Sequence, residues 1–315
     1  MSPASTEQFL LEQYTGHPAS QLQDLRKALY QSVFGCGHLI TDTSAAAEGI
    51  RREAAEAGPC SREIEALDGP WSRVHLGVLA DGLTPETLAC IFARSAAMPH
   101  GDADTLQEKL AVLRRLIHSG ALPYSPAEAD AELDDWRKNG FPACHHSDEY
   151  RAAYRPAYRV LHRTYVRLLP LLAAIDRTLK EKSRVLLAIE GGAASGKSTL
   201  AELLAVIYPD TVLFHADDFF LRPEQRTAAR YAQPGGNLDR ERLESEILAP
   251  ISRNEVAIYR PFDCHTLSLR EPMTVLPGRL NIVEGSYSFH PELARYYDLS
   301  VFLDISPETQ RSRIL

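Results

Sequence analysis

In the second half of the chain the sequence reads Gly191-Gly192-Ala193-Ala194-Ser195-Gly196-Lys197-Ser198. It matches the phosphate-binding pattern G-x-x-x-x-G-K-[ST], and it stands between a predicted strand, Val185 to Ile189, and an apolar-periodic predicted helix, Lys197 to Ile207. Small residues leave the backbone N–H groups of such a loop free to point at phosphate oxygens, and the helix that follows adds its positive dipole end. The pattern therefore predicts a binding site for a magnesium nucleoside triphosphate.

Three side chains of this loop and its helix carry the expected chemistry. Lys197 is expected to reach the β- and γ-phosphate oxygens, and the Ser198 hydroxyl to complete the shell of a bridging Mg²⁺. Thr199 is expected to donate toward the α-phosphate. The alternative is an ordinary glycine-rich turn with an exposed lysine, which the flanking strand and helix disfavour.

After Lys182, apolar runs alternate with helical patterns, which indicates a parallel sheet with helices on both faces. The strands predicted after the first are Thr211 to His215, Leu280 to Val283 and Leu299 to Ile305, and a further helix is predicted from Arg240 to Leu248. The fold class predicted for residues 183–315 is therefore α/β, a P-loop NTPase sheet with flanking helices.

Acidic residues follow two of these strands, at the sheet edge where open α/β folds bind ligands. Asp217 and Asp218 come after Thr211 to His215, and an acid in that place can accept a hydroxyl proton. Glu284 follows Leu280 to Val283, where it is expected to hold Mg²⁺ directly or through water. The structural alternatives are the cap of a turn and a solvated strand end.

Further motifs follow the P-loop along the chain. They are HADDFF (215–220), Asn237-Leu238-Asp239, YRPFDCHT (259–266), IVEGSYSFHPEL (282–293) and VFLDISPETQRSR (301–313). In kind and order they resemble the uridine kinase, phosphoribulokinase and pantothenate kinase group of P-loop kinases, and more narrowly bacterial uridine-kinase-like proteins with an extra N-terminal region. The resemblance covers residues 183–315 and implies a transferase that uses ATP and Mg²⁺ to phosphorylate an alcohol group.

The same resemblance implies roles for single residues near the acceptor. Asp217 would be the catalytic base, with Asp218 and Phe220 beside it at the acceptor. Asp239 would contact a sugar hydroxyl, and its alternative role is the N-cap of the helix that begins at Arg240.

Two arginines match the lid that folds over the phosphates in this family. Arg311 and Arg313 would stabilise charge on the transferring group, and a solvated helix face is their alternative. The chain stops at Leu315, within this predicted helix, so the domain is expected to be truncated in the lid region.

The stretch expected to bind the acceptor departs from the family pattern. Uridine kinases carry a tyrosine, aspartate and phenylalanine run and a nearby histidine, and the candidates here are Tyr259, Arg260, Asp263 and His265. The departure leaves nucleoside-like and sugar-like acceptors open. Two further interpretations stay open as well: a nucleotide-binding regulatory protein without small-molecule kinase activity, and an inactive member that still binds nucleotide.

The first half of the chain shows helical patterns and little chemistry. A mainly α-helical domain of unassigned role is predicted over 1–148, with one strand from Trp71 to Leu79, and a helical connector over 149–182. The connector carries a stripe of alternating aromatic and basic residues: Tyr150, Arg151, Tyr154, Arg155, Tyr158, Arg159, Arg163, Tyr165 and Arg167. Such a stripe can recognise phosphate or nucleic acid, but we expect a helix face packed on the kinase domain.

Composition limits the partners and the location. The chain of 315 residues has 34 Lys and Arg against 42 Asp and Glu, a net charge of −8, so no global positive field attracts nucleic acid. No apolar run approaches the roughly 18 residues of a membrane span. We expect a cytoplasmic protein whose partners are a nucleotide and a small-molecule acceptor, with neither nucleic acid nor membrane; a homo-oligomer is left open.

The cysteines are scattered without any C-x-x-C pair, which fits reduced thiols. They are Cys36, Cys60, Cys90, Cys144 and Cys264. A zinc site built from Cys36-Gly37-His38 and Cys144-His145-His146 is not expected, because neither segment has the usual ligand spacing.

Overall fold

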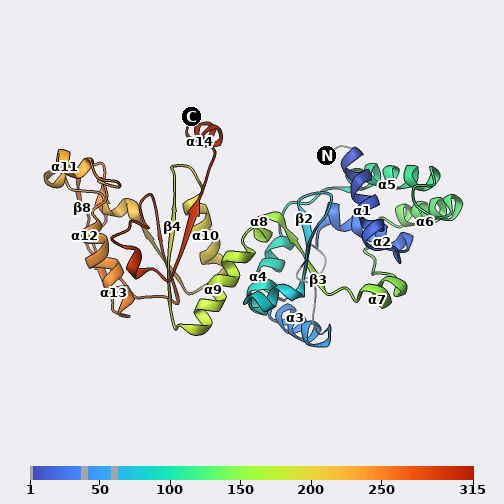
Figure 1. Ribbon diagram of the computed structural model, residues 1–315, viewed down its shortest axis with the longest axis horizontal. Coiled ribbons are helices and arrows are strands. Elements are labelled where there is room, and N and C mark those ends of the chain that lie inside the picture. The colour runs from blue at the N-terminus through green and yellow to red at the C-terminus, as the bar shows by residue number, and fades with distance from the viewer. Residues whose placement is uncertain (1–2, 37–41, 58–62) are drawn as a thin grey trace. The chain divides into compact units, whose positions relative to one another are not determined.

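The computed structural model of the chain describes residues 3–36, 42–57 and 63–315, so Gly37, His38 and Cys60 lie outside the described residues. The chain divides into two compact units, the N-terminal unit Met1–Ala173 and the C-terminal unit Ala174–Leu315, and each is described by itself (Figure 1). None of the helices in the described ranges combines the length and the apolar character that a bilayer crossing requires.

The N-terminal unit consists of helices around a small antiparallel sheet. Its helices are α1 (Pro3–Gly16), α2 (Leu22–Phe34), α3 (Thr43–Ala57), α4 (Pro85–Ala96), α5 (Ala103–His118), α6 (Pro126–Lys138), α7 (Asp148–Tyr154) and α8 (Arg163–Val166), with a 3-10 helix at Leu76–Asp81. Its strands are β1 (Ile64–Ala66), β2 (Trp71–His75) and β3 (Tyr158–His162), in the order β1-β2-β3. The mainly helical character expected of this half is observed.

The prediction of a helical connector over 149–182 is wrong at Tyr158–His162. Strand β3 lies there and runs antiparallel to β2, with Tyr158 opposite His75 and His162 opposite Trp71. A short apolar run fits a helix and a strand equally well, so pairing with β2 decides the outcome. The stripe of tyrosines and arginines is therefore divided between α7, β3 and α8 and does not form one helix face.

Trp71 lies in the core of the N-terminal unit and requires a glycine beside it. The side chain is 1% exposed, and Gly35 ends α2 directly against its ring. A Cβ on Gly35 would lie 2.6 Å from the ring atoms, and the backbone there has a φ of +62°. Both the close approach and the left-handed conformation exclude a side chain at this position.

Buried polar side chains tie α2 to the segment before α7 and to β3. Asp24 of α2 accepts hydrogen bonds from the Ser147 hydroxyl at 2.5 Å and from Nδ1 of His146 at 2.7 Å. Burial lowers the pKa of His146 to about 4, so the ring is neutral at pH 7. Because Nδ1 carries the proton, Nε2 accepts the hydroxyl of Tyr158 at 2.6 Å.

The C-terminal unit is built on a parallel sheet in the order β11-β4-β10-β5. Its strands are β4 (Val185–Gly191), β5 (Thr211–His215), β10 (Leu280–Glu284) and β11 (Leu299–Leu303). The helices are α9 (Leu169–Glu181), which crosses the boundary between the units, α10 (Lys197–Ile207), α11 (Ala228–Tyr231), α12 (Arg240–Arg242), α13 (Ala249–Ser252) and α14 (Pro307–Ile314). A π-helical stretch, Leu243–Leu248, joins α12 to α13.

Short elements complete this unit. They are 3-10 helices at Ala216–Phe219, Pro223–Gln225 and Ala294–Tyr296, and two ribbons, β6 (Ala257–Tyr259) with β9 (Met273–Val275) and β7 (Phe262–Asp263) with β8 (Ser268–Leu269).

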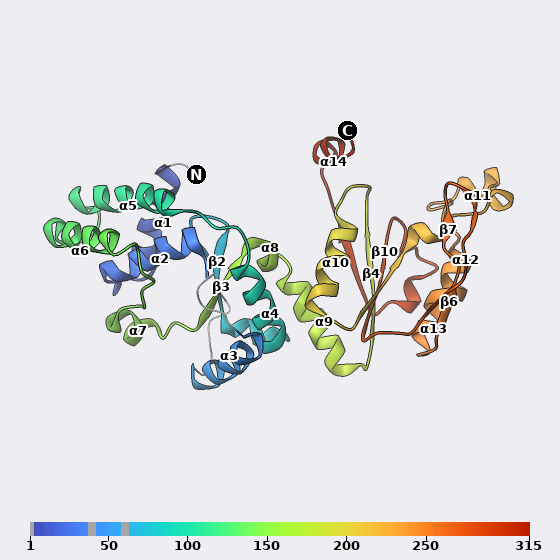
Figure 2. The ribbon, with the colours of Figure 1, turned by 180° about the vertical axis from the view of Figure 1, so that it is seen from behind.

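Helices cover both faces of the parallel sheet. Figures 1 and 2 show α10 on one side and α12 with α13 on the other, from opposite directions. Leu186 and Val283 of the sheet pack there against Leu243, Ile247 and Ile251 in one apolar core. The α/β fold class predicted for residues 183–315 is thereby confirmed.

We predict that the N-terminal unit loses stability as the pH falls from 6.5 to about 4. In the folded unit burial lowers the pKa of His146 to about 4, whereas the unfolded chain takes up this proton near 6.5, so acid favours unfolding. The loss is on the order of 3 kcal/mol. It is measured by urea unfolding across this pH window.

The comparison variants separate His146 from an exposed histidine of the same unit. His146→Phe is expected to unfold more easily at neutral pH and to show a flatter pH dependence across the window. His118→Ala, at a position 53% exposed, is expected to keep the full dependence. An undiminished slope in His146→Phe would show that another group is responsible.

Candidate nucleotide-binding site

Strand β10 brings three functional segments to one edge of the parallel sheet. It lies between β4 and β5, with Glu284 opposite Ile189 on one side and opposite His215 on the other. The P-loop follows β4, and the 3-10 turn Ala216–Phe219 follows β5. Since the carboxyl ends of parallel strands share an edge, the phosphate loop, Glu284 and the acids of this turn are neighbours.

The first glycine of the P-loop is fixed by its surroundings. Gly191 has a φ of +154°, and a Cβ there would lie 2.5 Å from the carbonyl oxygen of Leu303 and 2.7 Å from Oγ of Ser195. The close approach of β11 to the loop therefore excludes a side chain. At Gly192 a Cβ would lie 3.0 Å from the flexible end of Gln310 and in ordinary contact with Cγ2 of Ile305 at 4.0 Å.

The P-loop fits a phosphate ligand in two respects. Oγ of Ser195 is buried and has no hydrogen-bond partner within the part of the chain that the structure describes. Lys197 donates from Nζ to the carbonyl oxygen of Gly192 at 2.9 Å, so its ammonium group lies back over its own loop. A phosphate oxygen is a suitable partner for both groups, because each is a donor and phosphate is an acceptor.

Oxygen atoms suited to a magnesium ion lie at the start of α10 and the end of β10. The Ser198 hydroxyl donates to Oε1 of Glu284 at 3.1 Å, and Nδ1 of His215 approaches the same oxygen at 2.7 Å. Burial acts to raise the pKa of Glu284, but the hydrogen bonds from His215 and Ser198 outweigh it and the pKa is lowered. A carboxylate and a hydroxyl are ligands that Mg²⁺ accepts together with phosphate oxygens. Thr199 follows with an exposed side chain.

The two acids after β5 have different environments. Asp217 is exposed, whereas Asp218 is half-buried. Burial raises the pKa of Asp218, and the positive charges of His215 and Arg270 oppose this rise. Asp217 is therefore the acid of this turn that solutes reach directly.

Sequence reasoning missed two charged residues at this edge. His215 belongs to the HADDFF motif. Its pairing with Glu284 depends on the register of β5 with β10, which the motif itself does not show. Arg242 is 9% exposed and lies over the ring of Phe219 at 5.2 Å, with Nη1 lacking a partner in the described part of the chain. No local pattern in the sequence marks Arg242.

Two predicted acceptor residues are part of an aromatic cluster. Tyr259 is 5% exposed and stacks on Phe219, with ring centroids 5.6 Å apart. Phe220 is half-buried and meets Phe262 edge to face. These rings pack beside the turn that carries the acids, and their contact with an acceptor stays a prediction.

Two other predicted acceptor residues, Arg260 and Asp263, form hydrogen bonds at the β7–β8 ribbon. Arg260 donates from Nε to the carbonyl oxygen of Arg270 at 2.7 Å. Asp263 accepts the backbone N–H of His265 at 2.8 Å and Nε of Arg270 at 3.2 Å. The His265 side chain is exposed. The structure therefore shows a local structural role for Arg260 and Asp263.

Asp239 is the N-cap of α12, which is the structural alternative to a contact with the sugar. It is fully buried, and Oδ1 accepts the backbone N–H of Arg242 at 3.2 Å in the first turn of α12. Its other oxygen accepts Nε2 of Gln225 at 2.9 Å. Both carboxylate oxygens thus have protein partners, and a contact with a sugar hydroxyl stays a prediction.

The last helix is attached to the P-loop through side chains. Arg313 of α14 donates to the carbonyl oxygen of Ala194 at 2.9 Å, and Gln310 donates to that of Ala193 at 2.9 Å. Arg311 is exposed. The structure places one of the two predicted lid arginines in contact with the phosphate loop.

Comparisons with known proteins give matches among solved structures only. No family model matches the chain, and no curated protein does. A Bacillus stearothermophilus protein provisionally described as a uridine kinase is 21% identical, with 45% of this chain and 86% of that chain covered and a TM-score of 0.36. A Silicibacter sp. TM1040 protein provisionally described as a fructose transport system kinase is 25% identical, with 41% of this chain and 69% of that chain covered and a TM-score of 0.36.

We predict that Gly191→Ala destabilises the C-terminal unit by roughly 2–4 kcal/mol, because its Cβ meets a backbone carbonyl and a hydroxyl at a positive φ. Gly192→Ala is the matched control in the same loop, with an expected change within about 0.5 kcal/mol. Thermal unfolding of the three proteins measures the difference. Equal midpoints for both variants would contradict the close approach of β11 to the loop.

Proposed function

We propose that the C-terminal unit is an ATP- and Mg²⁺-dependent kinase that phosphorylates a hydroxyl group of a small nucleoside-like or sugar-like acceptor. The observation that supports it most is the contact between Ser198 of the P-loop and Glu284 at 3.1 Å, one strand away from the exposed Asp217. A phosphate loop with oxygen ligands for Mg²⁺ is common to many NTPases. Asp217, which follows the neighbouring strand β5, supports transfer of the phosphoryl group to an acceptor alcohol.

The phosphate end of the site is formed by the P-loop and the end of β10. The loop amides, the Ser195 hydroxyl and Lys197 hold the phosphate oxygens, and Lys197 exchanges its bond to the Gly192 carbonyl for one to phosphate. Ser198 and Glu284 hold the metal. When bound, Mg²⁺ neutralises charge on the phosphate oxygens.

The acceptor end is formed by the turn after β5. Asp217 orients the acceptor hydroxyl and takes its proton, while the acceptor oxygen bonds to the γ-phosphorus and the bond from that phosphorus to ADP breaks. Most of the rate enhancement then comes from positioning, since the protein itself forms no covalent bond. Arg311 and Arg313 of α14 add positive charge beside the loop.

Nucleotide binding is predicted to depend on the P-loop lysine. Calorimetric titration of the full chain with ATP and excess Mg²⁺ is expected to show binding that weakens at least tenfold in Lys197→Ala, because a charge-assisted hydrogen bond to phosphate is lost. Lys180→Ala, which removes an exposed lysine of α9 in the same unit, is the control and is expected to bind as the parent does. Absence of binding in the parent would overturn the proposal.

Acceptor turnover is predicted to depend on Asp217. In a screen of nucleosides and sugars by ADP release, Asp217→Asn is expected to lower kcat by about 10²–10⁴ with little change in KM, since it removes the proton acceptor. Asp218→Asn is expected to change KM more than kcat. If Asp217→Asn turns over an acceptor as fast as the parent, the base is elsewhere. If ATP binds and every acceptor fails, a nucleotide-binding regulatory protein is the better description.

A further inference from the structure

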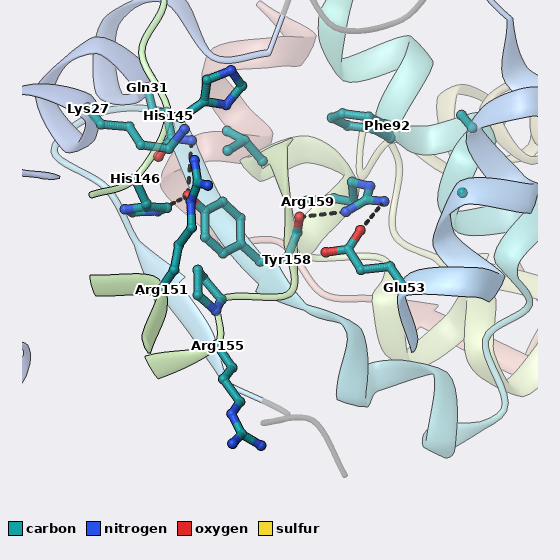
Figure 3. Close-up of a pocket in the computed structure, with 14 residues that line it drawn as sticks. Lys27, Gln31, Glu53, Phe92, His145, His146, Arg151, Arg155, Tyr158 and Arg159 are labelled. Carbon is teal, nitrogen blue, oxygen red and sulfur yellow. Dashed lines mark hydrogen bonds and ion pairs between the residues drawn. The ribbon is translucent and has the colours of Figure 1, made fainter. Parts of the chain in front are cut away.

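The N-terminal unit contains a cavity of about 920 Å³ that the proposed kinase chemistry does not use. Residues from α2, α3, α4, α7 and β3 line it, and basic side chains are prominent among them (Figure 3). Its volume is within the roughly 300–1,000 Å³ range of small-molecule sites. The cavity is therefore large enough to hold a whole metabolite.

One of the lining arginines is already neutralised. Arg159 of β3 pairs with Glu53 of α3 at 2.7 Å, and its guanidinium lies 5.8 Å from the ring of Phe92. Figure 3 shows this group on one side of the cavity, with Phe92 above the pair. This side offers an apolar ring and a balanced charge, which suits the organic part of a ligand.

The other side of the cavity holds a partly buried cation, Lys27, which has no carboxylate within ion-pair distance among the described residues. Lys27 of α2 has one hydrogen-bond partner among the described residues, the carbonyl oxygen of Cys144 at 2.9 Å. An ammonium group has three donors, so two remain for other partners. Burial lowers the pKa of Lys27, as the positive charges of Arg73 and Arg151 also do, although Cys144 and the Asp24 carboxylate act in the other direction. A buried cation with few partners is costly, and an anion in the cavity relieves that cost.

Arg151 of α7 adds a second cation near Lys27. Its nearest carboxylate among the described residues is that of Asp148, 3.8 Å away and almost fully exposed, so this pair is weak. Figure 3 shows the side chains of Lys27 and Arg151 extending toward the same region, whereas Arg155 points away from it. Two cations, Lys27 without an ion pair among the described residues and Arg151 with a weak one, thus face one part of the cavity.

The polar groups behind these cations are held in place by each other. The Tyr158 hydroxyl donates to Nε2 of His146 and accepts Nε2 of Gln31 at 3.3 Å. The Gln31 carboxamide oxygen accepts Nε of the buried Arg73 at 2.8 Å. The Asp24 carboxylate is occupied by His146 and Ser147. Asp24 therefore attracts Lys27 only from a distance, and neither Lys27 nor Arg151 has a hydrogen bond to a carboxylate of this network.

We propose that this cavity is a second ligand site, which binds a small organic phosphate monoester with its phosphate between Lys27 and Arg151 and its organic part toward Phe92. A phosphate monoester carries close to two negative charges near neutral pH and three strong acceptor oxygens, so it matches two cations with free donors. A single carboxylate matches only one of them. A nucleoside monophosphate and a sugar phosphate share this chemistry.

The test uses the full chain with Lys197→Ala, so that the P-loop contributes little to phosphate binding. AMP, ribose 5-phosphate, inorganic phosphate and succinate are titrated into it by calorimetry at low salt. At least one phosphate ester is expected to bind more tightly than succinate, and AMP against ribose 5-phosphate shows whether a base or a sugar is preferred. Binding of neither ester, or tighter binding of succinate, overturns the proposal.

Three further substitutions in the same background locate the site. Lys27→Ala and Arg151→Ala are each expected to weaken binding at least tenfold, and Arg155→Ala, whose side chain points away, to change it less than twofold. Arg151 is half exposed, so its variant is expected to fold even if Lys27→Ala does not. Binding that is unaffected by Arg151→Ala, or weakened equally by Arg155→Ala, overturns the assignment.

Discussion

The pairing of β10 with both β4 and β5 is the constraint on which the C-terminal unit depends. Because β10 is hydrogen-bonded to a strand on each side, Glu284 has a fixed height relative to Ile189 and His215. A shift of one residue in either pairing would turn Glu284 to the opposite face of the sheet and remove it from Ser198. The phosphate loop and the turn with the acids are separate in sequence, and only this register makes them one site.

Much of the C-terminal unit could be predicted from its sequence, because its signals are local. The P-loop pattern, the buried strands and the acids after them follow directly from neighbouring residues, and the strands lie close to where the apolar runs placed them. The features that sequence reasoning predicted wrongly or missed depend on contacts between residues that are distant in the chain. Tyr158–His162 became a strand through β2, and Arg242 reached Phe219 through the folding of α12 against the sheet. Neither partner can be read from the segment itself.

The core of the N-terminal unit contains buried charged side chains. Arg73 is 1% exposed and donates to Gln31 and Glu65, and Lys109 pairs with Asp68 at 3.0 Å. Such pairs contribute little net stability, because desolvation offsets their attraction, but loss of one partner leaves a buried charge that is costly. Loss of one partner is therefore expected to disturb the packing of the helices around the sheet, which also forms the walls of the cavity.

The attachment of α14 to the phosphate loop has a consequence for how sequence variation in this protein is interpreted. Gln310 is half-buried and Arg313 is exposed, and substitutions at such surface positions ordinarily have little effect on stability. Here each side chain donates a hydrogen bond to a carbonyl oxygen of the loop, 117 and 119 residues away along the chain, so an exchange on that helix removes a bond to the loop. Positions 310 and 313 should accordingly be treated as members of the loop when natural variants of this chain are compared, although neither belongs to its motif.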